Sequence, residues 1–402
     1  MRVLMITSSY PKWPGETNAP FIEAIAHGVA ARGHEVDLVL PHHPLWRRDA
    51  VEGRVRFFRY RYAPDAWSVW GYAQSMEADV RVRRSMYLLA PLVAVSLRAM
   101  LSARLTSRRY DVVHAHWVVP NAALVTDVVR AHGLPFVVSL HGSDVFLAER
   151  FAPARWLAAA AFRASRAVTA CSGDLRLRAL RLGADPLRSR TVPYGVDVAA
   201  FSPDTRAVGL RERLGVPSGA LLVLALGRLV EKKGFRHLIE AVAGCAGVHV
   251  AIAGDGDLRS SLEAQARASG APVSFPGTLE RDLMAGALAA ADVVAVPSVV
   301  DRAGNVDGLP NTLLEALASG RAVVASRVAG IPDVVRDGDN GLLVPEQDAA
   351  ALRLALERLR DDADLRARLG RAARAFALEH LTWPAAARAF EDAYVLAGAG
   401  RG

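Results

Sequence analysis

The stretch LLVLALGRLVEKKGF, residues 221–235, contains the strand, the glycine turn and the helix start that indicate the fold class of this chain. Its first six residues, 221–226, are all apolar, as in a strand buried on both faces. Gly227 and Arg228 follow, and a Lys-Lys pair then opens an expected helix over about 234–243. A continuous apolar strand that leads through a glycine loop into a helix is typical of a parallel sheet covered on both sides.

The same order of strand, loop and helix repeats along both halves of the chain. In the first half we expect strands over residues 3–6, 35–40, 111–117, 135–142, 167–172 and 190–196. In the second half we expect them over residues 221–228, 248–256, 273–277, 292–298, 322–328 and 341–345. The pattern predicts an α/β protein with two doubly wound, Rossmann-like domains that face a cleft. The Pro-, Gly- and Asp-rich segment 192–204 marks the boundary, so we assign 1–196 to the first domain and 197–383 to the second.

Composition excludes several classes of protein. Of the 402 residues 52% are apolar, which is too many for a disordered chain. Cys171 and Cys245 are the only cysteines, so a disulfide framework and a cysteine metal cluster are excluded. No apolar run approaches the roughly 18–20 residues that span a bilayer, and MRVLMITSSYP at the N-terminus fits a first strand better than a signal peptide. We therefore expect a cytoplasmic protein.

The chain has a net charge of +8 but contains no module that reads nucleic acid, so no nucleic acid is expected as a partner.

Residues 80–109 leave two interpretations open. They combine an apolar helical face with the basic residues Arg81, Arg83, Arg84, Arg98, Arg104, Arg108 and Arg109. A basic amphipathic segment can lie on an anionic membrane surface. The alternative is a helix packed on its own domain with arginines on the wet side. Residues 54–62, where arginines alternate with aromatics, predict an amphipathic edge strand, which adds weakly to the membrane interpretation.

The loop GRLVEKKGF, residues 227–235, is a candidate phosphate site. Gly227 allows a ligand to approach the backbone closely, and Arg228 and Lys233 place two cations where a helix begins. Free amides and the helix dipole attract phosphate at such a position. The alternative is an ordinary pair of solvated lysines.

A second candidate is DGLPNTLLEALASG, residues 307–320, with an expected helix over 312–318. Asp307 and Glu315 are hydrogen-bond acceptors only, so sugar or ribose hydroxyls are their natural partners and a metal is the rival. Gly308 removes side-chain bulk, Pro310 sets the turn, and amides for a ligand are offered by Leu309, Asn311 and Thr312. The alternative is a helix cap followed by a surface glutamate.

Two further candidates follow strands of the first half. His141 ends the strand in VVSLHGSDVF, at the edge where doubly wound sheets bind ligands. It could donate a hydrogen bond to a sugar hydroxyl or assist proton transfer, or be structural like His114 and His116. Gly15, in the loop after the first strand, lets the chain pass close to a ligand. No dinucleotide-binding G-x-G-x-x-G motif follows that strand, and the chain contains no P-loop, G-x-S-x-G or H-E-x-x-H motif.

Taken together, these segments resemble the retaining glycosyltransferases of family 4, which have the GT-B fold. The resemblance runs from MRVLMITSSYP through HGSD, VPYGVD, GRLVEKKG and DGLPNTLLEALASG to GIPDVV and NGLLVP. It implies that the second domain binds a nucleotide-diphosphate sugar and that the first domain binds the acceptor. It also implies that the final helix, about 384–398, returns to the first domain.

The resemblance implies a role for each candidate residue in the second domain. Arg228 and Lys233 match the pair that holds the donor diphosphate. Glu315 matches the acid that accepts the ribose hydroxyls, and the amides of 308–312 match those that line sugar and phosphate. Asp307 matches the acid that faces the donor sugar, although most relatives have glutamate there, one methylene longer.

In the first domain, His141 resembles the histidine that contacts the transferred sugar. Gly15 falls in the glycine-bearing first loop that faces the diphosphate, with Pro14-Gly15 where many relatives have paired glycines. The resemblance implies transfer of a hexosyl group with retention, and no metal or other cofactor is expected. A UDP-sugar is favoured over a GDP-sugar.

We therefore expect an enzyme that transfers a sugar to a glycan, a lipid-linked or a small-molecule acceptor in cell-surface polysaccharide or glycolipid synthesis. The location that fits this role is the cytoplasm, with peripheral contact at the inner face of the plasma membrane through residues 80–109. The alternatives are a nucleotide-sugar epimerase or hydrolase of the same fold and a non-catalytic, membrane-associated protein that binds nucleotide sugars.

Overall fold

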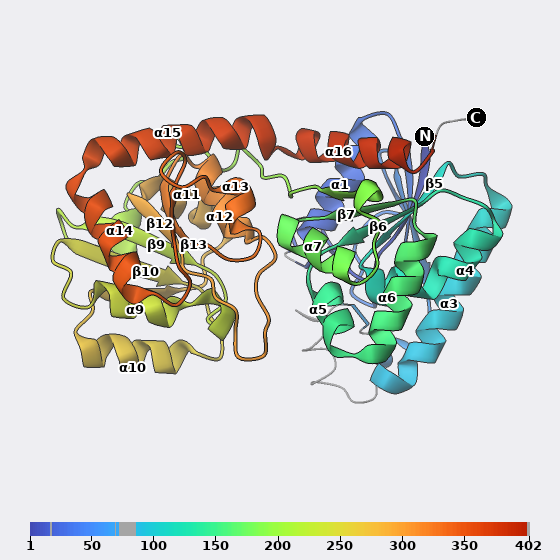
Figure 1. Cartoon of the computed structure of the whole chain (residues 1–402), viewed down its shortest axis with the longest axis horizontal. Helices are drawn as coiled ribbons and strands as arrows, with labels where there is room; N and C mark the ends of the chain where they lie inside the picture. Colours follow the sequence, from blue (N-terminus) through green and yellow to red (C-terminus); the bar gives the residue numbers. More distant parts are fainter. Residues whose placement is uncertain (17, 69, 72–85, 400–402) are drawn as a thin grey trace. The chain divides into compact units, whose positions relative to one another are not determined.

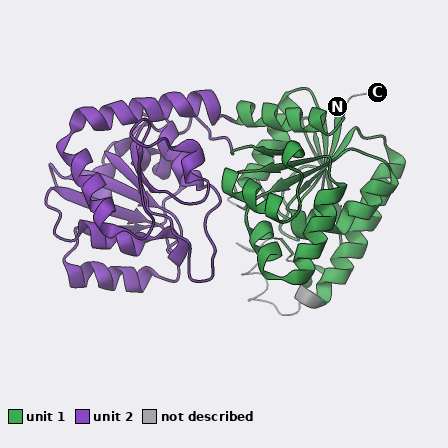
Figure 2. Cartoon of the chain, in the orientation of Figure 1, with its two compact units in different colours: residues 1–193, 383–402 green, residues 194–382 purple. Residues whose placement is uncertain are grey.

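The computed structural model describes residues 1–16, 18–68, 70–71 and 86–399. They form two compact units (Figure 2): unit 1 contains residues 1–193 and 383–402, and unit 2 contains residues 194–382. Unit 2 thus begins at Tyr194, three residues before the start that the composition indicated.

Unit 1 is built on an eight-stranded sheet with the strand order β3-β4-β2-β1-β5-β6-β7-β8. Neighbouring strands are parallel except β3 and β4, which pair antiparallel. The central strands β1, β5 and β6 are buried except at Arg2, which is why apolar residues predominate in their sequences. The strands are β1 (Arg2–Ile6), β2 (Glu35–Pro41), β3 (Val51–Glu52), β4 (Val55–Tyr60), β5 (Val112–His116), β6 (Phe136–Leu140), β7 (Ala167–Ala170) and β8 (Ser189–Thr191).

Two expectations about this sheet are corrected. The strand expected over 190–196 is only the three-residue β8, and the chain after Thr191 contains Pro193, which has no N–H to donate to a ladder. The expected edge strand, 54–62, is β4, but it is second in the sheet because the two-residue β3 pairs with its first residues.

Helices cover both faces of this sheet (Figure 1). Helices α1 and α16 contact each other on one face, while α4 lies between α3 and α6 on the other. The described helices of unit 1 are α1 (Pro20–Ala31), η1 (Asp65–Trp67), α3 (Met86–Ser107), η2 (Val118–Ala122), α4 (Ala123–Ala131), α5 (Ser143–Arg150), α6 (Ala152–Ala164), α7 (Gly173–Arg181), η3 (Pro186–Arg188) and α16 (Trp383–Leu396).

The return of the final helix to unit 1 is confirmed. A Cβ atom on Gly28 of α1 would lie 3.2 Å from the Cβ of Ala387, so the glycine permits close packing of α1 and α16. Glu391 of α16 forms an ion pair with Arg32 and a hydrogen bond with the ring of His34. Packing, the ion pair and the hydrogen bond therefore hold the end of the chain on the unit in which the chain begins.

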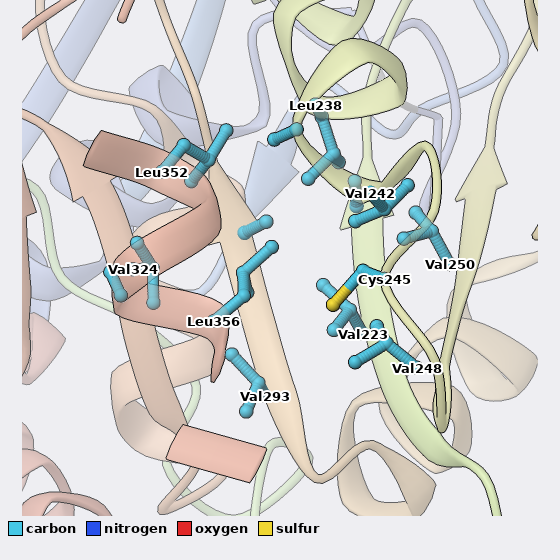
Figure 3. Close-up of a cluster of buried hydrophobic side chains, with 14 of the residues drawn as sticks. Val223, Leu238, Val242, Cys245, Val248, Val250, Val293, Val324, Leu352 and Leu356 are labelled. Atoms are coloured by element: carbon cyan, nitrogen blue, oxygen red, sulfur yellow. The ribbon is translucent and has the colours of Figure 1, made fainter. Parts of the chain in front are cut away.

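Unit 2 contains a six-stranded parallel sheet with the order β11-β10-β9-β12-β13-β14. Its core is formed mainly by branched aliphatic side chains from the sheet and from the helices α9 and α14 (Figure 3). The strands are β9 (Leu221–Leu226), β10 (Val248–Ala253), β11 (Val273–Gly277), β12 (Val293–Val296), β13 (Ala322–Ser326) and β14 (Leu342–Val344). The helices are α8 (Leu210–Arg213), η4 (Glu231–Lys233), α9 (Phe235–Val242), α10 (Arg259–Ser269), α11 (Arg281–Ala290), α12 (Asn311–Ala318), α13 (Ile331–Val334), α14 (Ala349–Asp361) and α15 (Ala363–His380).

The segment 80–109 is described from residue 86 onward, as helix α3, so Arg81, Arg83 and Arg84 lie outside the described residues. By length and composition alone, Leu88–Ser107 is apolar enough to cross a membrane, which the sequence analysis did not expect. Pro91, Ser96 and the arginines interrupt its apolar runs, but the average over the window stays high.

The arginines of α3 bind the rest of unit 1. Arg98 pairs with Asp127 of α4 at 2.5 Å, and Arg104 lies over the ring of Phe58 at 3.9 Å. Arg108 pairs with Glu35 of β2. These contacts correspond to a helix packed on its own domain, and any contact with a membrane depends on the side chains that face away from the sheet.

Candidate functional site

The loop after β9 is shaped by a glycine and crossed by a lysine side chain. Gly227 has φ +147°, and a Cβ atom there would lie 3.0 Å from the Cε of Lys233. Lys233 ends the short helix η4, after which Gly234, at φ +66°, turns the chain into α9. A Cβ on Gly234 would lie 1.8 Å from the carbonyl oxygen of Pro297, so this turn requires glycine. The two glycines therefore set the path along which Lys233 reaches its partner.

The turn between β10 and α10 packs against this loop and forms hydrogen bonds with it. The amide of Leu229 donates to the carbonyl of Asp255 at 2.9 Å, and the carbonyl of Leu229 accepts from Leu258 at 3.0 Å. A Cβ on Gly254 would lie 1.9 Å from the carbonyl oxygen of Gly227. The acidic-looking segment 253–259 is therefore a tight turn that packs against the candidate phosphate loop.

Asp307 lies between two ammonium groups. Its Oδ1 is 2.6 Å from the Nζ of Lys232, and its Oδ2 is 2.5 Å from the Nζ of Lys233. Burial raises the pKa of Asp307, but the charges and hydrogen bonds of Lys233 and Lys232 outweigh burial and hold that pKa far below its usual range. Asp307 is thus a carboxylate at any physiological pH, and it fixes the positions of both cations.

Glu315 projects from α12 near this ion-pair cluster and carries an unusual charge state. Burial raises its pKa to about 7, although the charges of Arg281 and Lys233 act in the opposite direction. Its buried Oε2 atom has no hydrogen-bond partner within the described part of the chain. A carboxyl group of this kind can accept hydrogen bonds from ligand hydroxyls near neutral pH.

The backbone before α12 presents amides at the helix start. Pro310 is the N-cap residue, and no side chain of the described residues caps the helix, which begins at Asn311. The first amides of a helix have no partner within the helix, so those of Asn311 and Thr312 can receive an anion. The carbonyl of Gly308 accepts a hydrogen bond from Gly330 at 2.9 Å, and Leu309 is buried, which anchors the segment that precedes these amides.

The ion-pair cluster contains a cation that was not among the predicted donor residues. Arg228 lies next to Gly227 with an exposed side chain, while the second cation on Asp307 is Lys232. Lys232 was not among the predicted site residues, although the Lys-Lys doublet was the available signal. Consecutive residues of an extended segment point apart, but in the short helix η4 both ammonium groups reach the same carboxylate.

His141 follows β6 in unit 1 and is enclosed by aromatic rings. Its ring centroid lies 4.9 Å from that of Phe21, the second residue of α1, and 4.8 Å from that of Trp117. Burial lowers the pKa of His141 well below its usual value, and His116 adds to this effect. His141 is therefore a neutral imidazole, suited to hydrogen bonding rather than to carrying charge.

Gly15 lies in the loop between β1 and α1, with φ +88° and an exposed backbone. Near it, the buried ammonium of Lys12 forms an ion pair with Glu16. A side chain at position 15 would meet no described atom within 4 Å, so space does not restrict this position. Glycine is favoured there because the backbone has a positive φ.

Asp144 fixes the turn that carries His141, a role that the sequence analysis did not assign. It is fully buried and accepts hydrogen bonds from the backbone amides of Val118 (2.8 Å), Gly142 (3.0 Å) and His141 (3.3 Å). Burial raises the pKa of Asp144, while these backbone N–H groups act to lower it.

Replacing Asp144 by alanine is expected to lower the free energy of unfolding by about 2–4 kcal/mol, because three buried amides lose their acceptor. Scanning calorimetry of the full chain measures this change. Asp174→Ala is the matched control, since that acid forms a partly exposed pair with Arg178 and its loss should cost at most about 1 kcal/mol. Equal unfolding temperatures for the two variants would contradict the role given to Asp144.

Among the described residues, one group of side chains could hold a metal ion, and it contains none of the predicted site residues. Glu23, His27 and Glu52 place ligand atoms within 4.8 Å of one another on α1 and β3. Arg48 forms ion pairs with both of these carboxylates. A cation at this position would have to displace the guanidinium group.

Known proteins match both units. Residues 19–195 match the family described as "Glycosyl transferase 4-like domain", and residues 220–362 match "Glycosyl transferases group 1". A D-inositol 3-phosphate glycosyltransferase from Acidothermus cellulolyticus is 32% identical over 383 residues, which cover 89% of this chain and 81% of that protein. The lipopolysaccharide core biosynthesis glycosyltransferase LpsE from Rhizobium meliloti is 38% identical over 175 residues, 43% of this chain and 49% of that protein.

A solved structure has the same fold over the whole chain. Sucrose-phosphate synthase from Thermosynechococcus elongatus superimposes with a TM-score of 0.76 and 21% identity, covering 98% of both chains. The two parallel sheets with their helices are thus the GT-B fold that the sequence predicted. The chain belongs to the family 4 glycosyltransferases and is a glycosyltransferase enzyme.

Proposed function

We propose that this enzyme transfers a hexosyl group from a UDP-sugar to a glycan, lipid-linked or small-molecule acceptor with retention of the anomeric configuration. The observation that carries the proposal is the arrangement of Lys232, Lys233 and Asp307 beside the start of α12 and Glu315. Two cations and free helix amides suit a diphosphate, and a buried carboxyl group suits the ribose hydroxyls.

In the proposed reaction the leaving group is a nucleoside diphosphate whose negative charge grows as the glycosidic bond breaks. Lys233, Lys232 and the amides of Asn311 and Thr312 stabilise this charge because they are already in place before the reaction. Asp307 holds the lysines and, as a permanent carboxylate, can accept a hydrogen bond from the donor sugar.

The anomeric configuration is retained because the acceptor attacks the donor sugar on the face from which the diphosphate leaves. The acceptor hydroxyl forms the new C–O bond as the old one breaks, and its proton passes to a phosphate oxygen of the leaving group. His141, neutral and enclosed, contributes a hydrogen bond to the transferred sugar in this proposal. No metal or other cofactor is assigned to the reaction.

The test is a panel of nucleotide sugars supplied to the purified full chain with and without candidate acceptors. We expect UDP-sugars to shift the unfolding temperature upward and one of them to be consumed faster with an acceptor present. NMR of the product should show the anomeric configuration of the donor. Release of free sugar at a rate independent of acceptor, or an epimerised nucleotide sugar, would contradict transfer and favour the alternative activities.

We further propose that unit 1 contacts an anionic membrane from the cytoplasmic side. Leu88, Leu92 and Val95 of α3 are 76%, 50% and 67% exposed, and their spacing of four and three residues places them on one helix face. On α6, Trp156 is 77% exposed and is preceded by the exposed Arg155. An apolar face with nearby arginines complements the interface of an anionic bilayer.

The topology supports a common orientation of these side chains. Helix α3 leads into β5 and α6 leads into β7, so both helices begin at the carboxyl edge of the parallel sheet. Leu88, Leu92 and Trp156 lie in the first halves of these helices and therefore toward that edge. This is also the edge where His141 follows β6, so a lipid-linked acceptor could reach the site from the bilayer.

Vesicle flotation tests the membrane contact. The full chain should float with vesicles that contain anionic lipid at low salt, and Leu92→Glu with Val95→Glu should reduce the bound fraction at least about tenfold through lost apolar burial. Leu354→Glu is the control, because Leu354 is 66% exposed on α14 of unit 2. Binding that survives the double substitution, or that Leu354→Glu abolishes equally, would rule out this face.

A further inference from the structure

Strand β5 places two buried histidines, His114 and His116, beside the strand end that carries His141. Both are fully buried and point to the same side of the strand, with ring centroids 4.2 Å apart. The two nitrogens of His114 are occupied: Nδ1 lies 2.9 Å from the hydroxyl of Tyr394 and Nε2 lies 2.6 Å from the hydroxyl of Ser139. His114 therefore belongs to a closed hydrogen-bond network in the core.

His116 differs because only one of its ring nitrogens has a partner among the described residues. Its Nδ1 lies 3.1 Å from the Nε2 of His141, and its buried Nε2 has no hydrogen-bond partner there. The ring planes of His116 and His141 are inclined by 26° with centroids 5.3 Å apart, so the two rings lie end to end, as this hydrogen bond requires. Burial lowers the pKa of His116 to about 3, so both rings are neutral and each carries one N–H.

Two proton arrangements are compatible with this hydrogen bond. If His141 donates from Nε2, the proton of His116 must be on its Nε2, where a buried N–H would have no acceptor. If His116 donates from Nδ1, its Nε2 is left with a lone pair instead. An orphaned buried N–H is rarer and costlier than an unfilled acceptor, so the second arrangement is favoured.

We infer that His116 is a positioning residue that fixes His141 as the tautomer protonated on Nδ1. His116 donates its Nδ1–H to the Nε2 of His141, and His141 is then a hydrogen-bond donor through Nδ1. An imidazole protonated on Nδ1 donates a hydrogen bond from that nitrogen, whereas the other tautomer can only accept one there. The catalytic meaning of this tautomer rests on the proposed function, but the tautomer itself does not.

The tautomer is measured by long-range proton–nitrogen NMR on the full chain labelled with nitrogen-15 in histidine. The His141→Gln variant assigns the signals of His141 by their loss. We expect Nδ1 of His141 to carry the proton in the wild type, and Nδ1 of His116 as well. A His141 protonated on Nε2 would overturn the inference.

Variants of His116 separate positioning from packing. His116→Phe should shift His141 toward the Nε2–H tautomer and lower kcat about 10–100-fold, as is usual for lost orienting partners. His116→Asn keeps an N–H close to the original Nδ1 and should restore the tautomer and most of kcat. His114→Phe, equally buried on the same strand, should reduce stability and leave the His141 tautomer unchanged.

Each result has a defined meaning. A tautomer of His141 that is the same in wild type and His116→Phe would overturn the positioning role. If the tautomer shifts as expected while turnover of nucleotide sugars does not change, the positioning role stands and the proposed contact of His141 with the donor fails.

Discussion

Lys233→Ala is expected to lower kcat/KM for the nucleotide sugar by about 10²–10³, the usual effect of removing one preorganised group that stabilises developing charge. The ammonium of Lys233 is held 2.5 Å from Asp307 and crosses Gly227, so it is positioned before the donor arrives. The variant should stay folded, because Asp307 keeps its second partner, Lys232, at 2.6 Å.

Steady-state kinetics with the best donor from the panel measures the effect, and circular dichroism checks the fold. Arg302→Ala is the matched control, since Arg302 is an exposed cation that pairs with Glu231 of the same helix η4 at 3.4 Å. We expect the control to change kcat/KM less than about threefold, as for a screened surface charge. Equal kcat/KM values for wild type and Lys233→Ala would show that Lys233 has no role in the reaction.

Glu315 is expected to make donor binding depend on pH around neutrality. Because burial raises its pKa to about 7, Glu315 is largely ionised at pH 8 and largely protonated at pH 6. Only the ionised form accepts hydrogen bonds from both ribose hydroxyls with both oxygens, so the Kd for UDP should rise as the pH falls through 7. Glu315→Gln should remove this pH dependence and weaken UDP binding by about 10–100-fold, the value of a hydrogen bond to a charged group.

The same group makes stability depend on pH in the opposite sense. The folded-state pKa of Glu315 is higher than the ordinary value of 4.5, so between these two values the folded chain binds more protons than the unfolded chain. The free energy of unfolding therefore falls as pH rises through this window, by about 3 kcal/mol in total. Glu315→Gln should be more stable than wild type at pH 8 and similar to it near pH 4.5.

Calorimetry at pH 5 and pH 8 measures the stability difference, and isothermal titration with UDP measures binding. A 2′,3′-dideoxy analogue of UDP is the ligand control, since it lacks the hydroxyls and should bind with little pH dependence around 7. If wild type and Glu315→Gln respond identically to pH in both measurements, the buried carboxyl group is not titrating near 7 and the ribose role is lost.

Much of the fold could be predicted because it depends on local periodicity. Continuous apolar strands such as 221–226, separated by helices, are typical of a parallel sheet whose two faces are both covered. The short strand β8 and the pairing of β3 with β4 could not be predicted, because three- and two-residue strands carry no periodic signal.

The candidate site was predicted in part, for a similar reason. Lys233 and Asp307 were found from the loop chemistry around Gly227 and Pro310, but their ion pair joins residues that are 74 positions apart. Lys232 was missed because a lysine doublet gives no indication that both ammonium groups reach one carboxylate. The arginines of α3 were also ambiguous, and the structure shows Arg98 bound to Asp127.

The sequence by itself determined the two Rossmann-like halves, the glycine turns and the family, because these depend on residues close together along the chain. Tertiary structure alone decided the charge states of Asp307 and Glu315. Both are acids eight positions apart on one short segment, yet two lysines lower the pKa of the first and burial raises that of the second. A carboxyl pKa is set by the solvent it loses and the charges it meets, and residues distant in the sequence supply both.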